Sequence, residues 1–326
     1  MYPIPIPDDT LLETHLLTRL DQKKCDLDAL RPLPAAAVQR LHEQLTLEWI
    51  YNSNAIEGNT LTLHETRLIL ETGLTIGGKS LREHFEVTNH RAAIDYVETL
   101  VQDAMPVSAF HVRQIHRLVM AQIDAQSAGN YRQLPVRIAG AAHTPPDTWE
   151  VERLMLAWGD WLAGPAQALH PVTRAALAHH RLVAIQPFLD GNGRTARLAM
   201  NLLLLRDGYP PTVILKVNRR QYYRVLAQAD AGRPAPFVNF VGRAVERSLA
   251  LYLEACTVQM APPPTDAAWI PLREAAQGTP YSQEYLSLLA RIGRLEAVKR
   301  GRNWYTTRRA VEAYQRSVAA SNQLAS

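Results

Sequence analysis

The chain has 326 residues, of which 47% are hydrophobic and 20% are charged, a composition that indicates a soluble globular protein and argues against a disordered one. No apolar run reaches the roughly 18 residues needed to span a bilayer, and the first residues lack the basic and apolar regions of an export signal. Cys25 and Cys256 are the only cysteines, which disfavours a disulfide framework or a structural zinc site and favours a cytoplasmic protein.

The formal excess of positive charge, +4, lies entirely in the last part of the chain. Residues 265–326 contain nine Lys and Arg but five Asp and Glu, whereas residues 1–264 are balanced. A basic segment of this kind attracts nucleic acid. A solvated surface that happens to be basic explains the charge equally well, so both interpretations stay open.

Most of the chain has the 3.6-residue periodicity of amphipathic helices. The first clear segment covers residues 35–51, and Thr62-Leu-His-Glu65 is a capping box that predicts the start of a second helix ending near Gly73. Further helices are expected over residues 81–101, 109–123, 151–162, 173–185 and 194–206. The fold class predicted for this part of the chain is therefore all-α.

Residues 131–146 interrupt this helical pattern. Val136 and Ile138 alternate with other residues, Gly140-Ala-Ala follows, and the segment ends in Pro145-Pro146. Alternation bounded by glycine and proline is typical of extended structure. We expect a short β-hairpin or extended flap inserted in the helical body.

Ala261-Pro-Pro-Pro264 predicts a stiff linker that separates two domains. After it, two short helices, strands over residues 295–298 and 303–306, and a final helix over residues 307–317 are expected. This order resembles a winged helix-turn-helix domain over residues 265–326. Upstream, we divide the chain into an N-terminal helical region, residues 1–100, and a core, residues 101–260.

The expected wing of the C-terminal domain carries Lys299, Arg300 and Arg302. Contacts from Lys and Arg to phosphates are the usual source of affinity for DNA, so these residues are candidates for DNA binding. A protein-docking or dimerisation module of the same fold is the alternative.

The most informative segment is Ile185-Gln-Pro-Phe-Leu-Asp-Gly-Asn-Gly-Arg-Thr-Ala-Arg197, a helix end, a tight polar turn and a helix start. Gly191 and Gly193 permit backbone angles that let consecutive N–H groups converge into an anion-binding nest. The nest lies at the N-terminus of the following helix, where the helix dipole also favours negative charge. The turn is therefore predicted to bind an anion.

Arg194 and Arg197 lie three residues apart, on one face of the first turn of that helix. Cations at this end of a helix oppose the dipole and are destabilising unless an anion is close. Asp190, just before the turn, is a suitable ligand for Mg²⁺ bound to phosphates. A nucleotide phosphate chain fits these residues, and a glycine-rich interhelical turn with exposed arginines is the alternative.

Residues 186–197 resemble the signature of the Fic family, His-Pro-Phe-x-Asp-Gly-Asn-Gly-Arg-x-x-Arg, at every position after the first. The resemblance extends over residues 30–245. Family members transfer AMP from ATP to a hydroxyl of a protein Ser, Thr or Tyr, and some remove it again. The resemblance implies a mainly helical Fic fold with a β-hairpin flap, joined to the winged-helix domain. It also implies that the protein uses ATP and Mg²⁺. The protein substrate would be either another protein or the chain itself.

Matching positions assign a role to each motif residue. Asp190 would hold Mg²⁺, and Phe188 would anchor the loop in the core. The flap would pin the backbone of the target by strand addition through Gly140, Ala141, Ala142 and His143. The residues that would contact the nucleotide are Gly191, Asn192, Gly193, Arg194, Arg197 and Tyr222.

Gln186 occupies the position of the family's general base, which is histidine. An imidazole accepts a proton near neutral pH, whereas a primary amide can orient a hydroxyl but has no useful basicity. We expect His179 and His180, on the preceding helix, to be packed or solvent-facing and not to replace the base. Activity is therefore expected to be low or abolished.

Ser53-Asn-Ala-Ile-Glu57-Gly58-Asn59 resembles the inhibitory motif that precedes the core in one class of Fic proteins. Glu57 would pair with Arg197 and deny this arginine to the γ-phosphate, because a charge-assisted pair competes with a phosphate contact. Taken alone, the segment also fits a helix end with Gly58 as its cap and a solvated Glu57. Together with the motif at residues 185–197, it predicts autoinhibition.

Three classes of function follow from these patterns. The first is a protein adenylyltransferase, or de-adenylylase, that Gln186 silences or slows. The second is phosphotransfer as in death-on-curing relatives, which usually alter the glycine turn that this chain retains. The third is a non-enzymatic nucleotide sensor coupled to a DNA-binding tail. The expected partners are ATP, a protein substrate and, in the third class, DNA, with a homodimer kept as an open alternative and no membrane partner.

Overall fold

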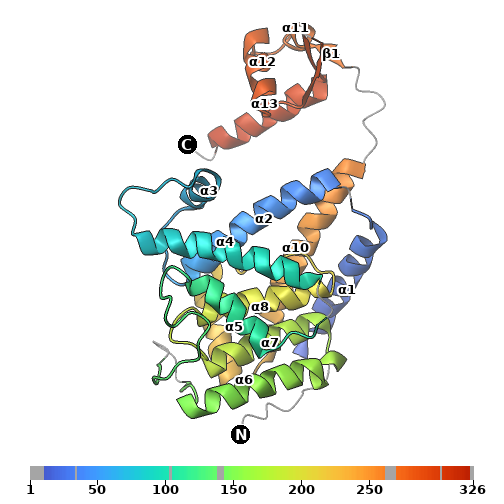
Figure 1. The fold of residues 1–326 in the computed structure, drawn as a ribbon. Coiled ribbons are helices and arrows are strands. Elements are labelled where there is room, and N and C mark those ends of the chain that lie inside the picture. The colour runs from blue at the N-terminus through green and yellow to red at the C-terminus, as the bar shows by residue number, and fades with distance from the viewer. Residues whose placement is uncertain are drawn as a thin grey trace. The chain divides into compact units, whose positions relative to one another are not determined.

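The computed structural model describes residues 11–33, 35–102, 105–137, 143–260, 269–301 and 303–323. The chain divides into two compact units, Met1–Gln259 and Met260–Ser326, and each unit has its own hydrophobic core (Figure 1). Within the described residues, no helix combines the length and the apolar character that crossing a bilayer requires.

The first unit is built from helices, which confirms the prediction of a mainly helical fold. Two short 3₁₀ turns at Pro165–Ala168 and Lys216–Asn218 join some of them. The helices are α1 (Thr14–Ala29), α2 (Ala35–Ile56), α3 (Leu63–Thr72), α4 (Leu81–Val101), α5 (Ala109–Met120), α6 (Thr148–Ala163), α7 (Pro171–Ile185), α8 (Asn192–Arg206), α9 (Arg219–Asp230) and α10 (Ala235–Met260).

Helix α8 lies inside the bundle, packed against α4, α5 and α7 (Figure 1). It is apolar on nearly all sides from Leu198 to Leu204, which is typical of a helix that is buried all round. The polar exception is Asn201, whose side chain donates to Thr212 O at 2.9 Å and accepts from Thr212 N–H at 2.7 Å. A buried amide must have its partners, so this pair fixes the chain that follows α8.

The signals for helix ends that the sequence carries are formed as expected. Thr62 accepts from the N–H of Glu65, whose carboxylate accepts from the N–H of Thr62, so the capping box opens α3. Gly73 closes the same helix in the left-handed conformation, with φ of 69°. These local contacts set the helix boundaries without help from the rest of the fold.

Other elements differ from the sequence-based expectation. Helix α2 continues beyond residue 51 to Ile56, and α1, α9 and α10 were not delineated. Residues 131–137 and 143–147 form neither helix nor strand, and the expected flap residues Gly140, Ala141 and Ala142 lie outside the described residues. The core of the first unit includes residues on both sides of position 100, and the division expected there stays a prediction.

The second unit contains a three-stranded antiparallel sheet in the order β1-β3-β2. Its core is formed by residues such as Leu272, Leu286, Leu289 and Val311. The order of the helices and of the last two strands agrees with the one read from the sequence, but β1 was not expected and β2 begins two residues later than predicted. The winged helix-turn-helix assignment stays a prediction. The elements are β1 (Ile270–Pro271), α11 (Leu272–Ala275), α12 (Gln283–Arg291), β2 (Ala297–Arg300), β3 (Asn303–Thr306) and α13 (Arg308–Gln323).

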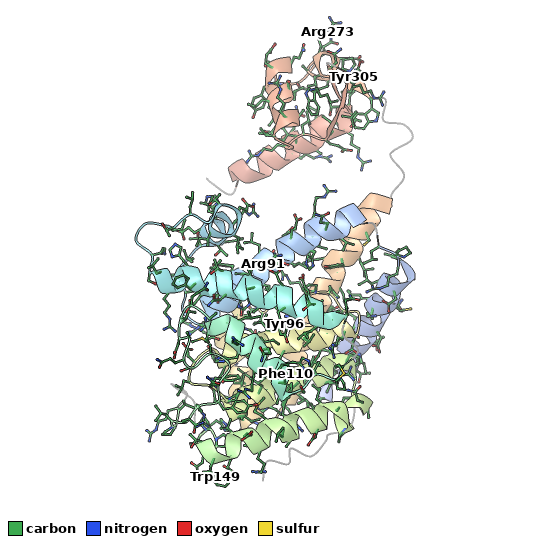
Figure 2. All side chains as sticks on the ribbon, viewed as in Figure 1. Arg91, Tyr96, Phe110, Trp149, Arg273 and Tyr305 are labelled. Carbon is green, nitrogen blue, oxygen red and sulfur yellow. The ribbon has the colours of Figure 1, made fainter. Side chains whose placement is uncertain are left out.

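Lys299 and Arg300 are exposed at the end of β2, and Arg302 lies outside the described residues. Arg300 lies 5.7 Å from the ring centre of Tyr305 on the neighbouring strand. Figure 2 labels Tyr305. The hairpin therefore presents two cations to solvent.

Candidate functional site

The loop between α7 and α8 holds the motif residues in a conformation that few side chains adopt. Gln186 ends α7 with φ of 47° and ψ of 62°, and it is the one residue other than glycine with a positive φ in the described part of the chain. Such a conformation costs about 1–3 kcal/mol and persists where surrounding contacts hold it. The strain falls on the position where the Fic signature has its base.

Arg132 supplies these contacts. Its buried guanidinium donates to Gln186 O at 2.7 Å and to Pro146 O at 2.5 Å, and its backbone N–H donates to Pro187 O at 2.9 Å. One side chain therefore ties the motif loop to the base of the expected flap. Sequence analysis missed Arg132, because an arginine after a turn carries no signal of burial.

The turn is also closed from within. Asn192 accepts from the N–H of Phe188 at 2.9 Å and donates to Phe188 O at 2.8 Å. The ring of Phe188 is fully buried and stacks on His116 of α5 at 3.6 Å between ring centres. The amide of Asn192 therefore shapes the loop, and Phe188 fixes it to the core.

His116 of α5 contacts the loop as a neutral imidazole with its proton on Nε2. Its Nδ1 accepts from the N–H of Gly129 at 2.9 Å, so its Nε2 carries the proton and donates to Asp190 O at 3.0 Å. Burial lowers the pKa of His116 to about 4, and Arg194 adds to the effect. His116 is a positioning residue that sequence analysis did not single out, since histidines inside amphipathic helices are usually packing residues.

Two glycines make the space in front of α8. Gly191 caps the helix with φ of 73°, which favours glycine over any residue with a side chain. A Cβ atom on Gly193 would overlap the carboxylate of Glu57, which comes from the end of α2. The start of α8 is thus occupied by an acidic side chain of the protein itself.

Arg197 is the cation that this carboxylate meets. It is 2% exposed and donates to Glu57 Oε1 at 2.8 Å, to Ser53 Oγ at 2.9 Å and to Ser53 O at 2.8 Å. Burial acts to lower the pKa of Arg197, but Glu57 and Tyr222 outweigh it and raise the pKa. The residue stays charged, and Gly58, with φ of 105°, turns the chain away directly after Glu57.

Arg194 lies near one acidic side chain of α4 and one of the loop before α8. Its guanidinium lies 3.5 Å from Glu86 Oε1 of α4 and 3.7 Å from Asp190 Oδ1. Asn59 donates to the other oxygen of Glu86 at 2.8 Å and holds it in place. Sequence analysis missed Glu86, which no local pattern connects to the motif.

Asp190 is half-exposed at the mouth of the site. Arg82 of α4 donates to its Oδ2 at 2.5 Å, and the N–H of Gly191 donates to its Oδ1 at 2.6 Å. Burial acts to raise the pKa of Asp190, but Arg194, Gly191 and Arg82 outweigh it and lower the pKa. The group is a carboxylate at neutral pH, and Arg82 is a further residue that sequence analysis did not identify.

The two tyrosines of α9 have different environments. Tyr222 is 1% exposed, with its hydroxyl 3.0 Å from His179 Nε2 and 3.4 Å from Arg197, whereas Tyr223 is 37% exposed. His180 pairs with Asp230 at 2.8 Å. His179 and His180 are therefore packed inside the bundle, and Tyr223 offers more ring surface to a ligand than Tyr222 does.

These residues surround a cavity of about 440 Å³, within the range of roughly 300–1,000 Å³ typical of small-molecule sites. Its floor is the start of α8, and its apolar wall includes Leu226. Its acidic and amide side chains are those of Glu57, Asp190, Asp230, Gln186 and Asn192. No histidine is among the described residues that line it. The cavity therefore offers positive charge and backbone N–H groups to an anion but no imidazole.

His143 is the one expected flap residue that the structure describes. Its Nε2 donates to Ala184 O at 2.8 Å, near the end of α7. The base of the segment expected to form the flap is thus joined to the helix that ends at Gln186.

Comparisons with known proteins agree with this geometry. Residues 106–204 match the family described as Fic/DOC family. The chain is 40% identical over 257 residues to "Protein adenylyltransferase Fic" of Nematostella vectensis, an alignment that covers 78% of this chain and 59% of that relative. The chain thus spans about three fifths of the length of this curated relative.

Two crystal structures resemble it closely. A Fic domain containing signaling protein from Bacteroides thetaiotaomicron is 32% identical with a TM-score of 0.69, covering 74% of this chain and 97% of that one. A Fic family protein from Desulfovibrio desulfuricans is 25% identical with a TM-score of 0.64, covering 94% of this chain and 98% of that one.

His116 predicts a specific pH dependence of stability. Its pKa is about 4 in the folded protein against 6.5 for the free side chain, so unfolding takes up a proton between these values. The contribution of His116 to the free energy of unfolding, up to roughly 3 kcal/mol, is fully present above pH 6.5. It is lost as the pH falls from 6.5 to 4. In His116→Gln the loss of stability between pH 7 and pH 4.5 should be smaller, as measured by urea unfolding.

The control is His15→Gln, at an exposed histidine of α1, whose slope of stability against pH is compared with that of the parent protein. An equal slope for His116→Gln and the parent protein would show that His116 is not held neutral.

Proposed function

This chain belongs to the Fic/DOC family, and we propose that it is a protein adenylyltransferase that transfers AMP from ATP to a hydroxyl group of a protein. The observation that carries the proposal is the pair Arg194 and Arg197, both 2% exposed, at the start of α8 beside the 440 Å³ cavity. Buried cations at a helix N-terminus need anions, and nucleotide phosphates supply them. The 40% identity to a protein adenylyltransferase supports the same reaction.

We place the phosphates of ATP at the start of α8, with the α-phosphate at the backbone of Gly191 and Gly193 beside Asn192. Arg194 and Arg197 would then bind the outer phosphates, and Tyr223 would lie along the nucleoside, with Tyr222 packed behind it. Fixed donors of this kind stabilise the charge that develops on the phosphates during transfer. The binding energy comes mainly from charge and hydrogen bonds at one end of the cavity.

The residues of the site fit Mg²⁺. Asp190 is a half-exposed carboxylate with a lowered pKa, and Mg²⁺ is usually bound through one or two carboxylates together with phosphate oxygens. Asp190 would hold the ion, which when bound neutralises part of the phosphate charge. Arg82 would have to release Asp190 Oδ2, so Arg82 competes with the ion.

Gln186 leaves the reaction without a general base. An amide can hold an attacking hydroxyl in place but cannot accept its proton, and general-base catalysis typically contributes about 10²- to 10⁴-fold to rate. Arg132 fixes the backbone of position 186, so a histidine there would inherit the loop conformation. The chain is thus built to bind and position substrates while turning over slowly.

We further propose that Glu57 inhibits the protein by occupying the place of a phosphate. Its carboxylate bonds to Arg197 at 2.8 Å and lies against Gly193. A charge-assisted pair of this geometry competes directly with the γ-phosphate for Arg197. Ser53 holds the same guanidinium and would keep its position when Glu57 leaves.

A non-enzymatic nucleotide sensor with a DNA-binding tail is the second candidate. Gln186 and the exposed Lys299 and Arg300 on the β2–β3 hairpin favour it. Phosphotransfer of the death-on-curing type is less favoured, because Gly191-Asn-Gly193 retains the adenylylating form.

Removing the charge of Glu57 should strengthen ATP binding. Glu57→Gln frees Arg197 for the γ-phosphate, and we expect Kd for ATP·Mg²⁺ to fall about tenfold, or about 1.4 kcal/mol. Calorimetric titration measures this. Glu246→Gln, which breaks an exposed pair with Arg19, is the matched control and should change nothing. Equal affinity in parent and Glu57→Gln would refute the inhibitory role.

Gln186→His combined with Glu57→Gly should convert an almost inert protein into one that adenylylates itself or a partner. The first change restores a base, worth about 10²- to 10⁴-fold, and the second frees Arg197. Mass spectrometry should detect an AMP adduct on a hydroxyl side chain that Glu57→Gly alone does not form at the same rate. If the double variant binds ATP and modifies nothing, the sensor hypothesis takes the place of the enzyme.

The tail predicts salt-dependent DNA binding. If Lys299 and Arg300 contact phosphates, replacing both with Gln should lower the slope of log K against log salt by about two. Gel-shift titration at several salt concentrations measures the slope. Arg273→Gln in the same unit (Figure 2) is the control. Absence of binding at low salt would favour the protein-docking alternative.

A further inference from the structure

A second, smaller cavity lies between α6 and α7. Its volume is about 100 Å³, well below the roughly 300 Å³ at which sites for nucleotides and similar ligands begin. This volume suits a single aliphatic side chain. The apolar residues that line it are Pro146, Leu154, Ala157, Trp158, Ala184 and Ile185.

One charged residue, Arg181, also lines this cavity. Its guanidinium stacks on the ring of Trp161 at 3.8 Å, and no carboxylate in the described part of the chain pairs with it. Its Nε is buried and meets no acceptor among the described residues. Burial lowers its pKa to about 10, so the side chain remains a cation at neutral pH.

An unmet donor of this kind is costly. A buried N–H without an acceptor costs about 1–3 kcal/mol, and native proteins keep few of them unless a ligand or water provides the acceptor. The stacking on Trp161 offsets part of the charge but accepts no hydrogen bond at the Nε edge. The cavity therefore combines an apolar pocket with a cation that lacks an anion.

The position of this cavity connects it to the reaction. Ala184 and Ile185 directly precede Gln186, and Pro146 accepts a hydrogen bond from Arg132, which also holds Gln186. His143 bonds to Ala184 O. The cavity is thus formed by α6, the end of α7 and the base of the expected flap, next to Gln186.

We propose that this cavity is a docking subsite for the protein substrate, which inserts one aliphatic side chain and binds Arg181 through the carboxylate of a neighbouring Asp or Glu. The occupant is an extended peptide segment, because the pocket accepts one side chain and the partly exposed guanidinium of Arg181 beside it attracts an acid. The inference rests on the proposed function, since it requires a protein substrate. It adds a preference for sequence around the modified residue.

Two short peptides test the subsite on the full chain. Acetyl-Ala-Leu-Glu-Ala-amide should shift the indole N–H resonances of Trp158 and Trp161 saturably, at millimolar concentration. Acetyl-Ala-Leu-Gln-Ala-amide, which lacks the charge, should bind about five- to tenfold more weakly, because a hydrogen bond to a charged group is lost. Both experiments need no substitution in the protein.

Substitutions then separate the pocket from the cation. Arg181→Gln should make the two peptides bind equally, and Ala157→Leu, which fills the cavity, should weaken both. Arg153→Gln, on the exposed side of α6 where it pairs with Glu150, is the control and should change neither. Equal binding of the two peptides to the parent chain, or unchanged binding to Ala157→Leu, overturns the proposal.

ATP titration of the same samples distinguishes failure of the subsite from failure of the enzyme. Peptide binding without ATP binding would refute the adenylyltransferase and leave a peptide site. ATP binding without peptide binding would refute only the subsite.

Discussion

The buried charge of Arg197 at the start of α8 is the constraint on which the rest of the site depends. A guanidinium at this end of a helix opposes the dipole, and its burial removes the water that would otherwise solvate it. Two residues far away in the chain stabilise this charge: Ser53 of α2, and Glu57 directly after α2. They lie 144 and 140 positions from Arg197 in the sequence, and the packing of α2 brings them to it. Any anion that binds Arg197 at this place must replace the carboxylate of Glu57 that is already bonded to it.

The loop around this charge is rigid for reasons separate from the ligand. Arg132 holds the carbonyl of Gln186, Asn192 closes the turn on Phe188, and neutral His116 supports Asp190 from below. A pre-formed loop spares the protein the cost of ordering it when substrates arrive. Position 186 therefore keeps the strained backbone conformation but carries the amide of Gln186 and no imidazole.

Charge is balanced pairwise across the site. Arg197 faces Glu57 of α2, and Arg194 faces Glu86 of α4, while Arg82 of the same helix holds Asp190. Two helices thus supply an acid to each cation and a cation to the acid that would hold Mg²⁺. Arg181, five residues before Gln186, stacks on Trp161 and has no ion pair among the described residues, and the buried Arg132 is bonded to carbonyl groups alone.

The sequence by itself determined the mainly helical fold and the capping box at Thr62, and it predicted a second domain after the proline linker and a functional role for the α7–α8 turn. Each rests on local chemistry, such as helix periodicity, turn glycines or adjacent cations, that neighbouring residues express without the fold. Only the tertiary structure decided that Arg132, His116, Glu86 and Arg82 support the motif, and that Tyr223 lines the cavity beside the more deeply buried Tyr222. These contacts join helices far apart in the chain, and burial, which makes each of them strong, has no signature in a single sequence.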